Sequence, residues 1–177
     1  MLGSLPRWAV ALGVATLLGH ANAWADDYDD VANLVRNGRQ TEALQRIEQV
    51  MATRPRDPQM RFFKGMIERE MGQTNQALAT FLALTQDYPE LPEPHNNLAV
   101  IYAAQNELAK ALASLENALR NNPNYAVAHE NLGDVYIRLA QAAYRSAQQF
   151  GAGSPALTQK MTSLITNLAA TPQGTQK

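Results

Sequence analysis

Two histidines in this chain have a spacing that would suit metal ligands on repeated helices. His95 and His129 are 34 residues apart, and imidazole is a common ligand of zinc. No third ligand is apparent from the spacing. The zinc motif with two histidines four residues apart on one helix also fails, because Gly133 stands where the second histidine would be. We therefore expect both histidines to pack between helices and predict no metal site.

Four carboxylates near the N-terminus are a second candidate for chemistry, at Asp26, Asp27, Asp29 and Asp30. Acidic residues at a helix start are stabilised by the positive end of the helix dipole, so we interpret them as a solvated helix start. Cysteine is absent, which excludes thiolate nucleophiles. No serine stands in a nucleophile elbow, and no glycine cluster has the lysine of a phosphate-binding loop. The sequence therefore predicts neither catalytic residues nor a cofactor.

The elements that would position these side chains repeat along the chain. Alanines and prolines recur at one interval of 34 residues, at Ala43, Ala77 and Ala111 and at Pro55, Pro89 and Pro123. A period of this length is typical of stacked helical hairpins. Each alanine is expected on the second helix of a pair, facing a small residue of the first helix, and each proline ends that second helix. The small residues of the first helices are Gly65, Ala99 and Gly133, while Gly38 and Gly72 mark first-helix ends.

These repeats resemble the tetratricopeptide repeat (TPR) family. The resemblance rests on Leu98, Ala99, Tyr102, Ala111, Leu115, Ala118 and Pro123 in the third unit and on Leu132, Gly133 and Tyr136 in the fourth. It covers roughly residues 26–140 and implies an all-α fold, a right-handed solenoid of antiparallel helix pairs. In this family the first helices line a concave groove, and the proteins usually bind other proteins and rarely catalyse reactions.

The last unit departs from the pattern. Arg145 stands at its alanine position, and no glycine, proline or asparagine interrupts residues 134–150. We therefore expect one long helix over about residues 126–149 in place of a fourth hairpin. Residues 156–169 contain apolar residues that share one helical face, and we predict a capping helix there. The face is formed by Leu157, Met161, Leu164, Ile165 and Leu168.

The domain organisation follows from this register. We predict a TPR domain over residues 26–170, with repeats at about 26–57, 58–91 and 92–125 and a partial repeat with its cap over 126–170. Residues 171–177 are expected to be a flexible tail. The composition of the 177 residues, 46% hydrophobic and 18% charged, is that of a folded protein. The net charge of -1 lacks the basic excess that nucleic acids attract, so we predict no nucleic-acid partner.

Residues 1–25 have the pattern of a cleaved signal peptide. Arg7 ends a short polar start, residues 8–18 are almost entirely apolar, and alanines follow. Cleavage after Ala23 or after Ala25 fits the small residues, and the acidic residues that follow favour the second site. An uncleaved inner-membrane anchor is the alternative, although the 16 residues from Trp8 to Ala23 fall short of the roughly 20 that span a bilayer. We expect a periplasmic protein of a Gram-negative bacterium with no stable membrane anchor after cleavage.

The TPR resemblance also implies which side chains face the groove. The candidates for peptide binding are Phe62, Phe63, Met66, Arg69, Asn96, Asn97, Glu130, Asn131 and Asp134. Asn97 and Asn131 share the position at which related repeats bind the backbone of a peptide, which suits an amide that both donates and accepts. The alternative is that both asparagines satisfy neighbouring main-chain groups. Adjacent residues of a helix point about 100° apart, so we expect one phenylalanine to be exposed, with Phe63 favoured over Phe62.

These observations predict a non-catalytic scaffold for protein–protein interactions in the bacterial cell envelope. Its partner would be another envelope protein that places an extended or helical segment in the concave groove. The alternative is a self-associating structural protein that assembles through the ends of the solenoid or through its C-terminal helix.

Overall fold

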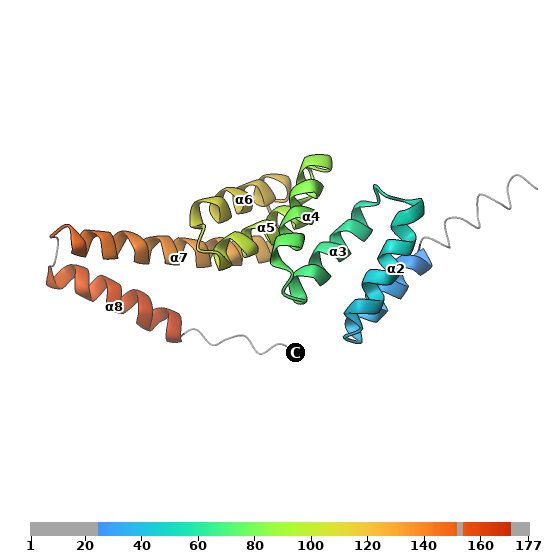
Figure 1. The fold of residues 1–177 in the computed structure, drawn as a ribbon. Coiled ribbons are helices and arrows are strands. Elements are labelled where there is room, and N and C mark those ends of the chain that lie inside the picture. The colour runs from blue at the N-terminus through green and yellow to red at the C-terminus, as the bar shows by residue number, and fades with distance from the viewer. Residues whose placement is uncertain (1–24, 152–153, 171–177) are drawn as a thin grey trace, which may run out of the picture. The chain divides into compact units, whose positions relative to one another are not determined.

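The computed structural model describes residues 25–151 and 154–170, and these residues form helices joined by short turns (Figure 1). The predicted all-α fold is confirmed. The chain divides into two compact units, of which the first ends at Pro89 and the second begins at Glu90. Each unit is described by itself below. The predicted signal peptide, except its last residue, and the predicted tail lie outside the described residues.

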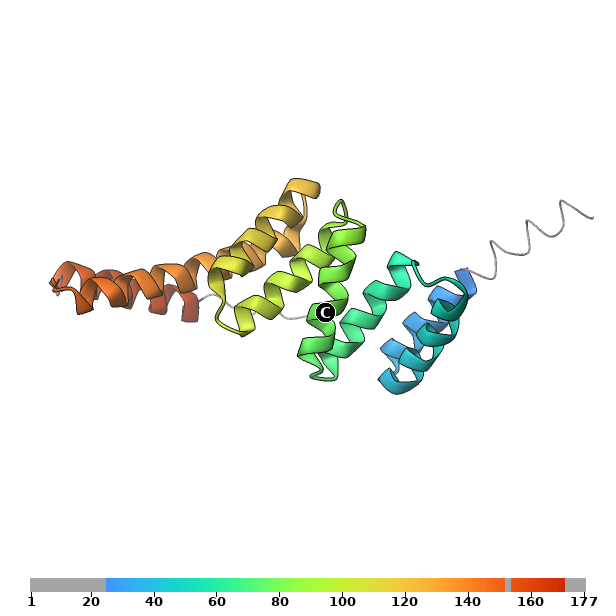
Figure 2. The same cartoon turned by 45° about the horizontal axis from the view of Figure 1, so that its top comes forward.

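The helices of both units pack in adjacent pairs. The first unit contains a helix over residues 25–36, followed by α2 (Gln40–Thr53), α3 (Pro58–Glu70) and α4 (Thr74–Asp87). The second contains α5 (Pro92–Ala104), α6 (Leu108–Asn121), α7 (Ala126–Gln149) and α8 (Pro155–Ala170). In the first unit α3 packs against α2 and α4, and in the second α6 packs against α5 and α7 (Figure 2). Within the described ranges, no helix has both the length and the apolar character needed to cross a bilayer.

The first helix of each complete pair ends at a residue with a left-handed backbone. Gly38, Gly72 and Asn106 are spaced by 34 residues and have φ angles of 70°, 74° and 61°. At each of them the backbone N–H bonds to the carbonyl three residues earlier, and the following N–H bonds to the carbonyl five residues before it. This is the Schellman arrangement, which glycine and asparagine tolerate best. The fourth unit has Ala140 at this position, and α7 continues because alanine disfavours the left-handed region.

The second helices end where the prolines require. The last residues of α2, α4 and α6 are Thr53, Asp87 and Asn121, each two residues before a repeated proline. Proline restricts the residue before it to an extended conformation and has no N–H to continue a helix. The periodic prolines therefore act as predicted.

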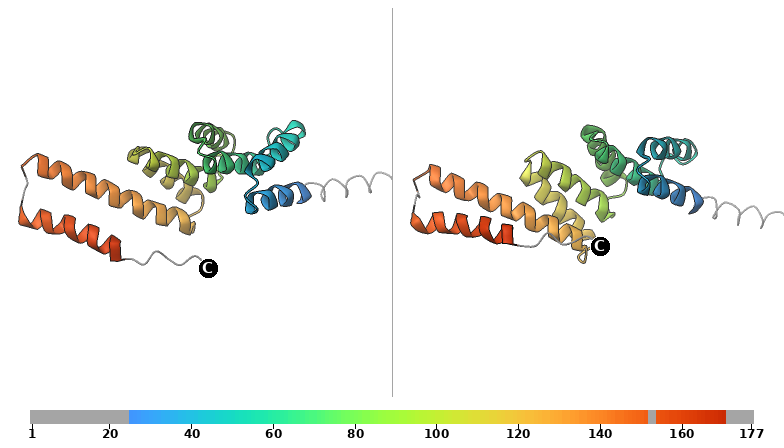
Figure 3. Two further views of the ribbon diagram at one scale, coloured as in Figure 1. Left: turned by 60° about the horizontal axis from the view of Figure 1, so that its bottom comes forward. Right: turned by 90° about the horizontal axis from the view of Figure 1, so that it is seen from below.

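The long terminal helix is also confirmed, because α7 runs without interruption from Ala126 to Gln149. Figure 3 shows α8 returning alongside α7, against which it packs. The backbone N–H of Leu157 bonds to the side-chain oxygen of Ser154, at 3.1 Å, and so caps the start of α8. Leu157, Met161 and Leu164 are half-buried, as expected for the apolar face of a capping helix.

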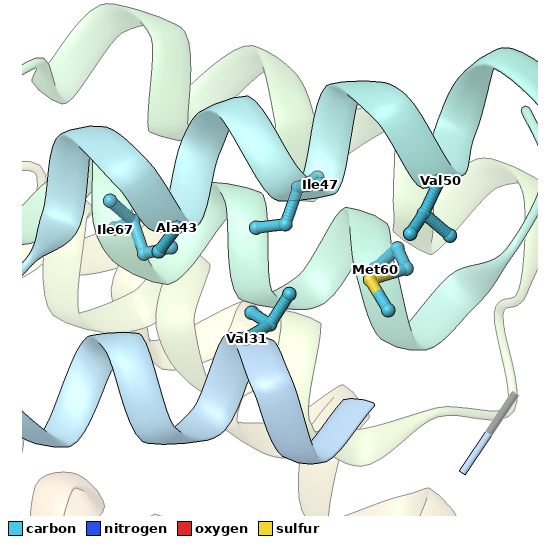
Figure 4. Packing of buried hydrophobic residues seen from close by; sticks show 6 residues of the cluster. All are labelled: Val31, Ala43, Ile47, Val50, Met60 and Ile67. Atoms are coloured by element: carbon cyan, nitrogen blue, oxygen red, sulfur yellow. The ribbon is translucent and has the colours of Figure 1, made fainter. Parts of the chain in front are cut away.

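The core of the first unit joins three neighbouring helices (Figure 4). Its buried side chains come from the helix over residues 25–36, from α2 and from α3, and they are Val31, Ala43, Ile47, Val50, Met60 and Ile67. The second unit has its own core, formed by Ala99, Ala111, Leu115, Ala118, Ala128 and Val135. Each unit thus buries the apolar stripe that its repeats predict.

The small residue on α3 makes room for a ring. A Cβ atom added to Gly65 would lie 2.8 Å from the Cε1 atom of Phe81, which is closer than such atoms approach in proteins. The close contact predicted for Gly65 therefore exists, but its nearest neighbour is the ring of Phe81 on α4 and not the predicted Ala77. At Gly133, the equivalent position on α7, no atom lies within 4 Å of an added Cβ. The incomplete fourth hairpin leaves that side of α7 open.

Asp27 corrects the interpretation of the N-terminal carboxylates. Its side chain is 18% exposed and accepts hydrogen bonds from Arg46, at 2.5 Å, and from Arg54. The hydroxyl of Tyr28 donates to Asp57 at 2.7 Å. Burial is the larger cause, and this hydrogen bond the next, of a pKa of Tyr28 that is raised above its ordinary value. Asp27 and Tyr28 therefore tie the first helix to α2 and to the turn before α3.

Candidate functional site

A pocket lies between α5 and α7 of the second unit. Its volume is about 410 Å³, and its lining comes from Ala99, Val100, Ala103, Asn131, Asp134, Val135, Ile137 and Arg138. Most of this surface is apolar, and the polar or charged residues that line it are Asn131, Asp134 and Arg138 of α7. An apolar pocket with a few polar groups is the usual form of a binding site.

The repeat explains why these side chains share one face. Val100 and Ala103 on α5 are one repeat away from Asp134 and Ile137 on α7. Helices of successive repeats lie in equivalent orientations, so equivalent positions form neighbouring parts of one wall. Val100, Ala103 and Ile137 provide the apolar part of the pocket, while Asp134 adds a charge to it.

Polar side chains of α7 hold this helix against α5. The side-chain amide of Asn131 donates to the side-chain oxygen of Asn96 at 2.8 Å. The guanidinium of Arg138 donates to the backbone oxygen of Ala103 at 2.6 Å and to the side-chain oxygen of Asn106 at 3.1 Å. The last carbonyl groups of a helix lack partners within the helix and carry partial negative charge. Arg138 therefore stabilises the C-terminal end of α5 while it lines the pocket.

The two asparagines proposed for peptide binding differ in their surroundings. Asn131 is half-buried and lines the pocket. Asn97 is only 6% exposed, and its amide donates to the backbone oxygen of Glu93 at 2.9 Å. This bond agrees with the alternative interpretation, in which the asparagines satisfy neighbouring main-chain groups. A bond between Asn97 and a peptide backbone stays a prediction.

The predicted site residues on α3 belong to the first unit. Phe62, Phe63, Met66 and Arg69 are all half-buried. The ring of Phe62 lies 5.9 Å from that of Phe81, and Phe63 packs against the core shown in Figure 4. The expectation of one exposed phenylalanine is wrong, because α4 covers one side of α3 and the core of the first unit covers the other.

The predicted site residues of the second unit lie on α5 and α7. Asn131 and Asp134 line the pocket, Asn96 bonds to Asn131, and Glu130 is exposed one turn before Asp134. The pocket also contains Val100, Ala103, Ile137 and Arg138, which hold groove positions in the same register, and Ala99 and Val135, which do not. Periodicity alone could not place Ala99 and Val135 in the pocket, because both are also buried in the core of the second unit.

The prediction that both histidines pack between helices is wrong for His129, whose side chain is exposed. The ring nitrogen Nε2 of His129 lies 2.9 Å from the backbone oxygen of Pro123, so this side chain bonds to the turn before its own helix. His95 is half-buried on α5. Over residues 25–151 and 154–170, no three histidine, aspartate or glutamate side chains gather as a metal site requires.

Comparisons with known sequences identify repeats in both units. A family profile described as a tetratricopeptide repeat matches residues 31–92, and another described as a TPR repeat matches residues 100–139. The TPR repeat-containing thioredoxin TTL4 of Arabidopsis thaliana is 33% identical over 78 residues, which are 44% of this chain and 11% of that protein. The chain therefore spans only about a tenth of the length of this relative.

Solved structures have the same fold. A thermophilic TPR protein of Thermus thermophilus is similar with a TM-score of 0.60 and 23% identity, over 81% of this chain and 82% of that one. The type III secretion chaperone SycD of Yersinia enterocolitica, in complex with a peptide of the translocator YopD, has a TM-score of 0.59 and 16% identity, over 66% of this chain and 95% of SycD. Together the two profile matches span more than half of this chain, which therefore belongs to the tetratricopeptide repeat family.

Proposed function

We propose that this protein is a non-catalytic scaffold of the bacterial cell envelope that binds a segment of a partner protein in the pocket between α5 and α7. The observation that carries the proposal is the pocket itself, which combines an apolar surface at Val100, Ala103 and Ile137 with polar groups at Asn131 and Asp134. The apolar part would bury a side chain of the partner. The amide and carboxylate groups would pair with polar atoms of the same segment.

Two further observations support the proposal. The structure of SycD, which has a similar fold, contains a peptide of another protein, so a peptide is a reasonable ligand for this fold. The predicted signal peptide supports a place in the periplasm, where the partner would be another envelope protein. An uncleaved inner-membrane anchor would place the same pocket at the membrane surface.

Filling the pocket with a larger side chain should abolish binding of the partner. Ala103 is half-buried and lines the pocket, so Ala103→Trp places an indole ring where the segment would bind. Ala113 is exposed on α6 and does not line the pocket, which makes Ala113→Trp a matched control. In affinity capture from an envelope extract of the source organism, we expect Ala103→Trp to lose a set of proteins that the wild type and Ala113→Trp retain.

The comparison requires that both variants keep the helical circular dichroism and melting temperature of the wild type. If Ala103→Trp then captures the same proteins as the wild type, the pocket is not the binding site.

A further inference from the structure

We infer that the partner segment carries a lysine or arginine beside the apolar side chain that enters the pocket. This inference rests on the proposed function and adds the chemical class of the ligand. The general groove of the family does not determine that class, because it depends on which charges this chain places around its own pocket.

One carboxylate, Asp134, lines the pocket, and a second, Glu130, lies one helical turn before it on α7. Glu130 and Asp134 are four residues apart on α7, so they lie on one face of that helix. Both are exposed, and no hydrogen bond or ion pair to either carboxylate occurs among the described residues. Asp134 lines the pocket directly. A bound segment would therefore meet uncompensated negative charge at this rim.

The nearby cation forms no ion pair with these carboxylates among the described residues. Arg138 follows Asp134 by four residues, an interval at which opposite charges commonly pair on a helix. Its guanidinium instead donates to the backbone oxygen of Ala103 and to Asn106 at the end of α5. The positive charge of Arg138 thus serves the contact between the two helices, and Asp134 is left for a ligand.

Acidic residues outnumber basic ones at the groove positions of α5 and α7. The charged residues at these positions are Glu93, Glu130, Asp134 and Arg138, of which Asp134 and Arg138 line the pocket itself. The whole chain is nearly balanced, with 15 lysines and arginines against 16 acidic residues. An arrangement of this kind favours cationic segments and disfavours acidic ones.

The pocket fits a segment with both features. An apolar side chain would contact Val100, Ala103 and Ile137, while a neighbouring lysine or arginine would extend along α7 toward Asp134 and Glu130. The long aliphatic stems of lysine and arginine cover apolar surface while their charges remain in water. Exposed ion pairs of this type contribute more to specificity and association rate than to affinity.

Selection from a displayed library of random peptides tests the inference. The wild type should enrich peptides in which lysine or arginine adjoins a large apolar residue. For one such synthetic peptide, Glu130→Gln with Asp134→Asn should weaken binding on the order of fivefold and reduce its dependence on salt. Glu90→Gln with Glu116→Gln removes two exposed charges of the second unit outside the pocket and should leave binding unchanged.

The possible outcomes separate this inference from the proposed function. Peptides that Ala103→Trp no longer binds, but that show no basic preference, would overturn the inference and leave the pocket as a peptide site. An unchanged affinity in the Glu130→Gln, Asp134→Asn variant would also overturn it. If no peptide is enriched, or if Ala103→Trp binds the selected peptides as the wild type does, both proposals fail.

Discussion

Phe81→Ala is expected to lower the free energy of unfolding of the first unit by about 3–5 kcal/mol. Phe81 has no exposed surface, its ring lies 5.9 Å from that of Phe62, and it fills the space beside Gly65. Truncation would leave a cavity between α3 and α4 that neither backbone can close completely. Chemical denaturation followed by circular dichroism measures the loss.

The glycine beside this ring gives a sharper test of the same contact. In the wild type, Gly65→Ala should cost roughly 1–3 kcal/mol, because its Cβ would collide with the ring of Phe81. In the Phe81→Ala background the same change should be neutral or stabilise by up to about 1 kcal/mol, since alanine favours a helix over glycine. Gly133→Ala is the matched control, because its Cβ would meet no atom within 4 Å. A Gly65→Ala variant as stable as the wild type would contradict the packing described for α3 and α4.

Asp27→Asn is expected to destabilise the first unit by about 2 kcal/mol. The substitution keeps the size of the side chain but removes the charge that Arg46 and Arg54 share. Arg54 is the more buried of the two arginines, with its side chain 17% exposed, so losing the charge of Asp27 costs more there than at Arg46. Thermal unfolding measured at low and at high salt reports the change.

Asp29 provides the control for this prediction. It belongs to the same run of carboxylates but is exposed and makes no ion pair among the described residues. Asp29→Asn should therefore change the free energy of unfolding by less than about 0.5 kcal/mol. Equal effects of the two substitutions would mean that Asp27 acts only through the helix dipole, as the sequence alone suggested.

The helix boundaries could be predicted because each depends on the chemistry of one residue. The repeated prolines end the second helices. The long helix α7 could be predicted because no glycine, proline or asparagine occurs in residues 134–150. Asn106 was harder to interpret, since asparagine adopts the left-handed conformation only in some contexts. Its place in the series of Gly38 and Gly72 becomes clear from its φ angle of 61°.

The contacts between distant residues could not be predicted in the same way. Asp27 is 27 residues from Arg54, and Arg138 is 32 residues from Asn106. Nothing in the local sequence indicates which of several available cations a carboxylate will choose. The partial burial of both Phe62 and Phe63 likewise depends on packing against α3 from two sides. The register predicts that Asn131 and Asp134 face the groove, and both line the pocket. It could not show that Asp134 forms no ion pair among the described residues, because that depends on where Arg138 binds.

The central claim is that the pocket between α5 and α7 holds a segment of the partner, and crosslinking in cells tests it most directly. A photoreactive amino acid would be placed at Val100, which lines the pocket, and in a second strain at Glu116, which is exposed on α6. Mass spectrometry of the crosslinked peptides would identify the residues reached. We predict that Val100 crosslinks to one defined segment of one envelope protein, that Ala103→Trp abolishes this crosslink, and that Glu116 does not reach the segment. Crosslinks from Glu116 to the same segment, or a crosslink from Val100 that survives Ala103→Trp, would contradict the account.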